Sequence, residues 1–217
     1  MSVARARSDR GAWNGAAEPA AELDELCLRR AQRGEEAACR ALVERYQRPV
    51  FALLHRMLGP ARRDRVEDLA QETFLHVFRA LAGFAPLGPA RLSTWILTIA
   101  SRRAIDELRR RARAGEVETE SLGGQDAVSP ERADDGARRT ALAARVAAAV
   151  EALAPEYRAA FLLRAFHGLE YAEIGRALDI DLGTVKSRLA RARAAVRGAL
   201  GQDARPEARE DKDESDE

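Results

Sequence analysis

The stretch from Gly183 to Gly201 carries five basic side chains and no acidic one. At the helical angle of about 100° per residue, its apolar side chains fall within an arc of roughly 60°. Those side chains are Val185, Leu189, Ala192 and Val196. The opposite side holds small residues, which let a helix approach the floor of a DNA groove. There, Ser187 and Arg191 reach base edges while the flanking cations hold phosphates. The pattern predicts the recognition helix of a helix-turn-helix.

A second basic stretch covers residues 101–113, with six arginines and two acids. Arg102, Arg109 and Arg113 lie within an arc of about 40° on a helix. A breaker-rich loop at 83–89 precedes it, and arginines next to such a loop suit single-stranded or melting DNA. The arginines follow phosphates and the loop pockets an unstacked base. Phe84 in this loop is the candidate for a base contact, whereas we expect Trp95, set among Leu92, Ile96 and Ile99, in the core.

An acidic segment at residues 64–72 carries a net charge of −3. On a helix its polar side chains form one face beside two apolar residues. These are Asp64, Asp68, Gln71 and Glu72 beside Leu69 and Phe74. Taken by itself, such a face is usually a solvated surface.

Helices are the elements expected to position these residues, because Ala, Leu, Arg and Glu abound while β-branched and aromatic residues are few. We predict an all-α chain of two small helical domains, joined by a flexible acidic linker, with a helix-turn-helix at the end of the second. The predicted order is a disordered leader (1–21), a first domain (22–112), the linker (113–137), a second domain (138–201) and a disordered acidic tail (202–217). Pro49 is expected to kink or break one helix, and Pro155 to begin another.

The near-neutral total charge does not exclude a nucleic-acid partner. The chain has 36 basic and 35 acidic residues, for a net charge of +1. That value is a cancellation between the two basic helices and the acidic linker, tail and segment 64–72.

Several classes of protein are not expected from this sequence. The sequence lacks the roughly 18 consecutive apolar residues that a membrane span needs. It also lacks the apolar stretch near the N-terminus that a secretory signal needs. Cys27 and Cys39 do not make a disulfide framework, so a cytoplasmic protein is expected. His55, His76 and His167 are scattered, so we expect no metal, no cofactor and no enzyme active site.

Three segments resemble the extracytoplasmic-function (ECF) sigma factors of bacteria. LEYAEIGRALDIDLGTVKSRLARARAAVR resembles their promoter-reading segment, EDLAQETF their polymerase-binding motif, and STWILTIASRRAIDELRRR their minus-10 segment. Three positions depart from the family pattern. Asp179 replaces a usual Gly, Gly175 a usual Ala, and Arg102 stands where many members have Asn. Asp tolerates the left-handed turn, and Gly175 is expected to cost a little helix stability.

The resemblance implies a dissociable promoter-specificity subunit of RNA polymerase, acting on promoter DNA and held by a cognate anti-sigma protein. The implied polymerase contacts are Asp64, Glu67, Asp68, Leu69, Gln71, Glu72 and Phe74. The implied minus-10 contacts are Phe84, Arg102, Arg103, Arg109, Arg110 and Arg113. The implied minus-35 contacts are Thr184, Lys186, Ser187, Arg188 and Arg191. The linker is then either a solvated tether or a segment that mimics nucleic acid near the RNA exit path.

The alternative is a stand-alone helix-turn-helix repressor or activator with an unrelated N-terminal partner domain. It predicts binding to duplex DNA without polymerase, and it leaves the acidic segment at 64–72 without a role. An enzyme is the third class and has the least support.

Overall fold

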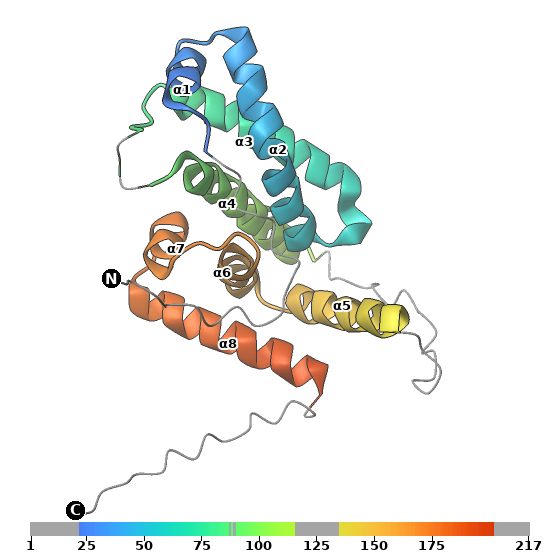
Figure 1. Cartoon of the computed structure of the whole chain (residues 1–217). Helices are drawn as coiled ribbons and strands as arrows, with labels where there is room; N and C mark the ends of the chain where they lie inside the picture. Colours follow the sequence, from blue (N-terminus) through green and yellow to red (C-terminus); the bar gives the residue numbers. More distant parts are fainter. Residues whose placement is uncertain (1–21, 87, 89, 116–134, 202–217) are drawn as a thin grey trace, which may run out of the picture.

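The computed structural model describes residues 22–86, 88, 90–115 and 135–201. All regular secondary structure in these ranges is helical, as expected (Figure 1). The predicted leader, the predicted tail and linker residues 116–134 lie outside the described residues. Of the rest of the predicted linker, Arg113 ends one helix and Asp135 begins the next.

The first unit contains four α-helices and a short 3-10 turn. They are α1 (Glu25–Gln32), α2 (Glu36–Leu58), η1 (Pro60–Arg62), α3 (Arg63–Leu81) and α4 (Leu92–Arg113). Helix α2 packs on α1, α3 and α4 through the buried side chains of Leu42, Tyr46 and Val50. The predicted break at Pro49 is wrong, because α2 continues through that residue to Leu58.

The second unit contains α5 (Asp135–Glu151), α6 (Pro155–Ala165), α7 (Tyr171–Leu178) and α8 (Leu182–Leu200). Pro155 occupies the first turn of α6, as predicted, where its missing N–H costs no hydrogen bond. The apolar stripe predicted for α8 is confirmed by the burial of Val185, Leu189, Ala192 and Val196. On α5, Val146 and Val150 are buried, whereas Leu142 is exposed.

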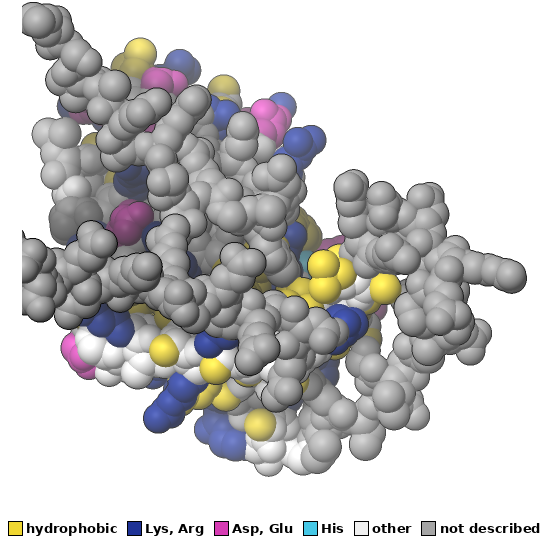
Figure 2. All heavy atoms as spheres, turned by 60° about the horizontal axis from the view of Figure 1, so that its bottom comes forward, with side chains coloured by type: hydrophobic (Ala, Val, Ile, Leu, Met, Phe, Trp, Pro, Cys, Tyr) yellow, Lys and Arg dark blue, Asp and Glu magenta, His cyan; other side chains and the backbone are white. Residues whose placement is uncertain are grey.

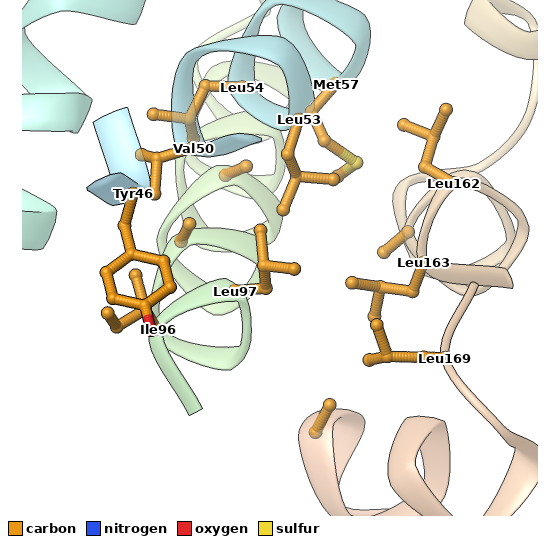
Figure 3. Close-up of a cluster of buried hydrophobic side chains, with 14 of the residues drawn as sticks. Tyr46, Val50, Leu53, Leu54, Met57, Ile96, Leu97, Leu162, Leu163 and Leu169 are labelled. Atoms are coloured by element: carbon orange, nitrogen blue, oxygen red, sulfur yellow. The ribbon is translucent and has the colours of Figure 1, made fainter. Parts of the chain in front are cut away.

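The two units share one hydrophobic core. Helix α4 packs on α6 and α7, and α2 packs on α5 and α6. Figure 3 shows Leu53 and Met57 of α2 on the side that faces Leu162 and Leu163 of α6, and all four side chains are fully buried. This interface is not predictable from the sequence, whose composition marks only a boundary between the units.

Candidate protein and nucleic-acid interfaces

The predicted acidic face lies on α3, and its members divide into two groups. Asp64, Glu67, Asp68 and Gln71 are exposed. Leu69 and Phe74 are only 2% and 8% exposed, so they support the face from within. Glu72 is half-buried, and its carboxylate accepts from Arg65 at 3.3 Å and from Arg103 at 3.0 Å.

An apolar groove of about 360 Å³ runs beside this acidic face. It is lined by Val43, Gln47 and Phe51 of α2 and by Glu67, Ala70, Gln71 and Phe74 of α3. Phe51 is 38% exposed, whereas its neighbours Val50, Leu53 and Leu54 on α2 are fully buried. The nearby Leu75 is 55% exposed. Acidic and apolar groups therefore adjoin here, which is the composition of a surface that binds a basic protein.

A buried carboxylate ties α3 to α4 behind that face. Glu107 of α4 is 4% exposed and pairs with Arg65 at 3.0 Å, Arg110 at 2.9 Å and Arg111 at 3.0 Å. These guanidinium groups, Arg110 foremost, lower the pKa of Glu107 to about 2. Glu107 is therefore ionised at neutral pH, and Arg110 has a structural partner in addition to its predicted DNA contact.

The other predicted minus-10 arginines also have acceptors within the chain. Arg102 donates through Nε to the carbonyl of Ala177 at 2.9 Å. Arg109 donates through Nε to Glu156 at 2.7 Å. Arg113 donates to the carbonyl of Arg109 at 3.3 Å, inside α4 itself. The basic side of α4 is thus covered in part by acceptors of the second unit.

Two hollows adjoin the N-terminal half of α4. Phe84 stacks on Trp95 with ring centroids 5.1 Å apart and a tilt of 41°. Both rings line a hollow of about 340 Å³ beside the loop, with Ala80, Gly83, Ala85, Gly88 and Ala90. A larger groove of about 550 Å³ contains Trp95, Ile99, Arg102 and Arg103 on α4 and Arg176 on α7. Trp95 packs against the core as expected, and it also lines both hollows.

The helix-turn-helix is formed by α7 and α8. Asp179 adopts the left-handed conformation, with φ 55° and ψ 55°, as the turn requires. The N–H of Ile180 donates to the carbonyl of Gly175 at 2.9 Å and closes the turn. A Cβ on Gly175 would lie 2.9 Å from the carbonyl oxygen of Ile180. Gly175 therefore lets the backbone of the turn lie close against α7, a role that the sequence does not predict.

Asp181 begins α8 and fixes one predicted DNA contact. Its carboxylate accepts from the N–H of Thr184 at 2.9 Å and from the Thr184 hydroxyl at 2.6 Å. These bonds, that of the hydroxyl foremost, lower the pKa of Asp181. The Thr184 hydroxyl is therefore part of the helix cap, and its predicted contact is at the start of the helix.

The remaining predicted minus-35 residues follow along α8. Lys186, Ser187 and Arg191 are exposed, and Arg188 is half-buried. Figure 2 shows basic side chains (dark blue) next to hydrophobic ones (yellow) on the face of the molecule where α8 lies. The sequence offered no signal for Tyr157 of α6, whose hydroxyl accepts from Arg191 Nη1 at 2.9 Å.

Comparison with known proteins connects these surfaces to one family. Residues 42–114 match the sigma-70 region 2 family, and residues 143–196 match sigma-70 region 4. The chain is 34% identical to the RNA polymerase sigma-H factor of Pseudomonas aeruginosa over 189 residues, which cover 82% of this chain and 94% of that protein. It is 33% identical to the ECF RNA polymerase sigma-E factor of Escherichia coli K12, covering 80% and 92%. This chain belongs to the ECF sigma factors.

Two solved structures share the fold. CnrH, solved in complex with the cytosolic domain of CnrY, matches with a TM-score of 0.58 and 24% identity, over 83% of this sigma factor and 99% of CnrH. RpoE of Bartonella quintana, solved with the anti-sigma factor NepR, matches with a TM-score of 0.55 and 20% identity, over 76% and 97%. Helices α2–α4 therefore form region 2, and α5–α8 contain region 4.

The described residues of this sigma factor contain neither a helix suited to cross a membrane nor a metal-binding cluster. No helix among them has the length and apolar character that a membrane crossing needs. No cluster of three or more His, Cys, Asp or Glu side chains among them could hold a metal ion.

Proposed function

We propose that this sigma factor docks on core RNA polymerase through α3, holds melted minus-10 DNA along α4, and reads the minus-35 element with α8. One observation carries the proposal. A single chain contains an exposed acidic face with an adjoining apolar groove, and also a helix-turn-helix whose second helix has no acid. A stand-alone DNA-binding regulator accounts for the second feature but not for the first.

Core binding rests on the exposed acids of α3 and the groove beside them. Asp64, Glu67 and Asp68 complement a basic partner and set its orientation, while burial of Phe51 supplies apolar contact area. Leu69 and Phe74 act from the interior by fixing the helix on which those acids stand.

Minus-10 binding rests on α4 and the loop before it. The arginines of α4 follow the phosphates of the opened strand, and the hollow beside Phe84 and Trp95 accepts an unstacked base. These arginines are Arg102, Arg103, Arg109 and Arg110. This role needs the arginines to exchange their present acceptors for phosphate oxygens, which charge-assisted hydrogen bonds favour.

Minus-35 reading rests on the exposed side of α8. Ser187 and Arg191 reach base edges in the major groove, and Lys186 and Arg188 hold the neighbouring phosphates. Tyr157 orients Arg191 through its hydroxyl.

An anti-sigma protein is the second proposed protein partner. NepR is an anti-sigma factor by name, and it accompanies RpoE in one of the two solved structures that share this fold. We infer that a cognate protein of this kind binds the present chain and keeps it from polymerase.

The core-binding role is tested with a charge reversal on α3. Asp68→Arg removes an exposed acid and adds a cation against a basic partner, so we expect loss of co-purification with core polymerase. Glu36→Arg is the matched control, because it reverses an exposed acid at the start of α2, outside this face. Core binding by the Asp68 variant at the level of the control would overturn the assignment.

The alternative function is tested in the same preparation without polymerase. A stand-alone regulator binds its duplex site in an electrophoretic mobility shift assay by itself. The proposed function predicts that stable promoter binding appears only after core polymerase is added.

A further inference from the structure

The side of α4 that we assign to minus-10 DNA is occupied by the second unit of the same chain. Thr94, Arg102 and Arg109 lie at spacings of eight and seven residues, which places them on one side of the helix. Each contacts α6 or α7. The Thr94 hydroxyl donates to Glu173 at 3.1 Å, Arg102 binds carbonyls of α7, and Arg109 pairs with Glu156. The contact thus extends along most of α4.

Arg102 makes the most specific of these contacts. Its Nε donates to the carbonyl of Ala177 at 2.9 Å, and its Nη2 donates to the carbonyl of Arg176 at 3.3 Å. Both carbonyls lie in the last turn of α7, where backbone acceptors have no partner within the helix and the helix dipole favours a cation. An Asn side chain at this position would be too short to make this two-pronged contact.

Apolar packing stabilises the same interface. Leu162 and Leu163 of α6 are fully buried in the core that they share with α2 (Figure 3). Arg158 of α6 is 3% exposed and donates to the carbonyl of Met57, at the end of α2. The interface is therefore a packed and hydrogen-bonded surface. The hydrogen bonds of the exposed Arg102 fix the orientation of α7 on α4.

We infer that the helix-turn-helix unit is an intramolecular competitor of minus-10 DNA, and that Arg102 is the latch that holds it against α4. We call the arrangement in which α6 and α7 pack on α4 closed. The competition rests on the proposed function of α4, whereas the existence of the closed arrangement does not. In the closed chain, Glu156 and the carbonyls of α7 accept hydrogen bonds from arginines that would otherwise bind phosphates. DNA can use this side of α4 only after α6 and α7 have moved away.

The latch is tested by measuring the distance between the units in the full-length chain. Donor and acceptor dyes are attached at Glu44→Cys of α2 and Ala195→Cys of α8, both exposed, after Cys27 and Cys39 are changed to Ser. Single-molecule energy transfer without DNA or polymerase then reports the closed and open fractions. We expect one predominant high-transfer population for this parent chain.

Arg102→Asn is expected to increase the open fraction about fivefold, since it removes two hydrogen bonds from a partly solvated cation. Arg113→Asn is the control, because it removes the same charge from α4 while the contact of Arg113 stays within the helix. A parent chain that is already open, or equal open fractions in the two variants, would overturn the latch.

The competition has its own readout, the binding of a fluorescent single-stranded minus-10 oligonucleotide without polymerase. Glu156→Gln frees Arg109 and leaves every arginine of α4 in place, so we expect about threefold tighter binding. Asp181→Asn removes an equal charge from the same unit, where the contacts of Asp181 lie within the first turn of α8, and it is expected to change nothing. Equal affinities for the two variants would overturn the competition. A closed parent chain in which no variant binds the oligonucleotide would instead contradict the proposed function of α4.

Discussion

The basic side chains of α4 and of α8 in this sigma factor have different kinds of partner. On α4, the arginines have acceptors from three sources: Glu72 of α3, Glu107 within the helix, and α6 and α7 of the second unit. On α8, Lys186 and Arg197 are exposed, and the hydrogen bonds of Arg191 and Arg193 go to neutral tyrosine hydroxyls. Arg188 is the exception on α8, because it is half-buried and its charge acts on the carboxylate of Glu156. Under the proposed function, the other cations of region 4 bind DNA directly, whereas those of region 2 first exchange partners.

The difference follows from what each helix does besides binding DNA. Helix α4 lies between α2, α3, α6 and α7, so its cations need compensation where they approach the core. Helix α8 lies at the edge of the molecule in Figure 1 and buries a narrow stripe. A helix at the edge can leave its other side solvated.

The largest expected effect comes from neutralising the carboxylate inside α4. Glu107→Gln leaves Arg65, Arg110 and Arg111 around an uncharged amide, so we expect a loss of about 2–3 kcal/mol in the free energy of unfolding. Urea denaturation measures it. Asp106→Asn is the control, since it changes an exposed neighbour, and it is expected to change the stability by less than about 0.5 kcal/mol. Equal stability of the two variants would show that α4 does not depend on internal compensation.

Removing a cation from α8 is expected to affect DNA binding rather than folding. Arg191→Ala should weaken minus-35 recognition by polymerase holoenzyme by roughly 1–3 kcal/mol. Its unfolding free energy should stay near that of the parent, because the side chain is exposed. Competition assays with intact and scrambled minus-35 elements measure the first quantity. An equal loss on both DNAs would mean that Arg191 contacts phosphates and not bases.

A substitution at Tyr157 tests whether Arg191 on α8 needs a hydrogen-bond partner within the chain. Tyr157→Phe removes the hydroxyl that accepts from Arg191, and we expect minus-35 recognition to weaken by about 0.5–1 kcal/mol. Tyr171→Phe is the matched control, because its hydroxyl accepts from Arg193 at a longer 3.4 Å. If the Tyr157 variant keeps full discrimination between intact and scrambled elements, Arg191 needs no support from α6.

The smallest expected effect is a pH dependence at the interface between the units. His167 follows α6, and burial together with the charge of Arg56 lowers its pKa from 6.5 to about 4. The unfolded chain then binds the proton more strongly, so this contribution to stability is complete above pH 6.5 and is lost as the pH falls toward 4. The melting temperature should fall between pH 7 and pH 5, and His167→Gln should reduce that fall. His76→Gln changes an exposed histidine and is the control. If it reduced the fall in melting temperature by a comparable amount, His167 would not be the source of that fall.

The helices were predictable from sequence because their signals are local. The stripe of α8, the proline that begins α6 and the left-handed Asp179 each depend on neighbours within a few turns. The break predicted at Pro49 does not occur, because Tyr46 and Val50 pack in the core on both sides of the missing N–H and hold α2 together.

The candidate surfaces were predictable in residue type but not in their surroundings. The bond from Arg102 joins residues 75 positions apart and ends on a backbone carbonyl, which every residue possesses. No side-chain pattern can mark such an acceptor. Phe51 has the spacing of a core residue, and only the packing of α2 on α3 decides that it borders a groove.

The central claim is that this chain directs polymerase to promoters through both regions, and run-off transcription with purified core polymerase tests it most directly. Templates come from a library of genomic fragments of its own host. The account predicts discrete transcripts with the parent chain, none with Asp68→Arg, and fewer from the same promoters with Arg191→Ala. A parent chain that neither joins core polymerase nor yields a transcript from any fragment would contradict it.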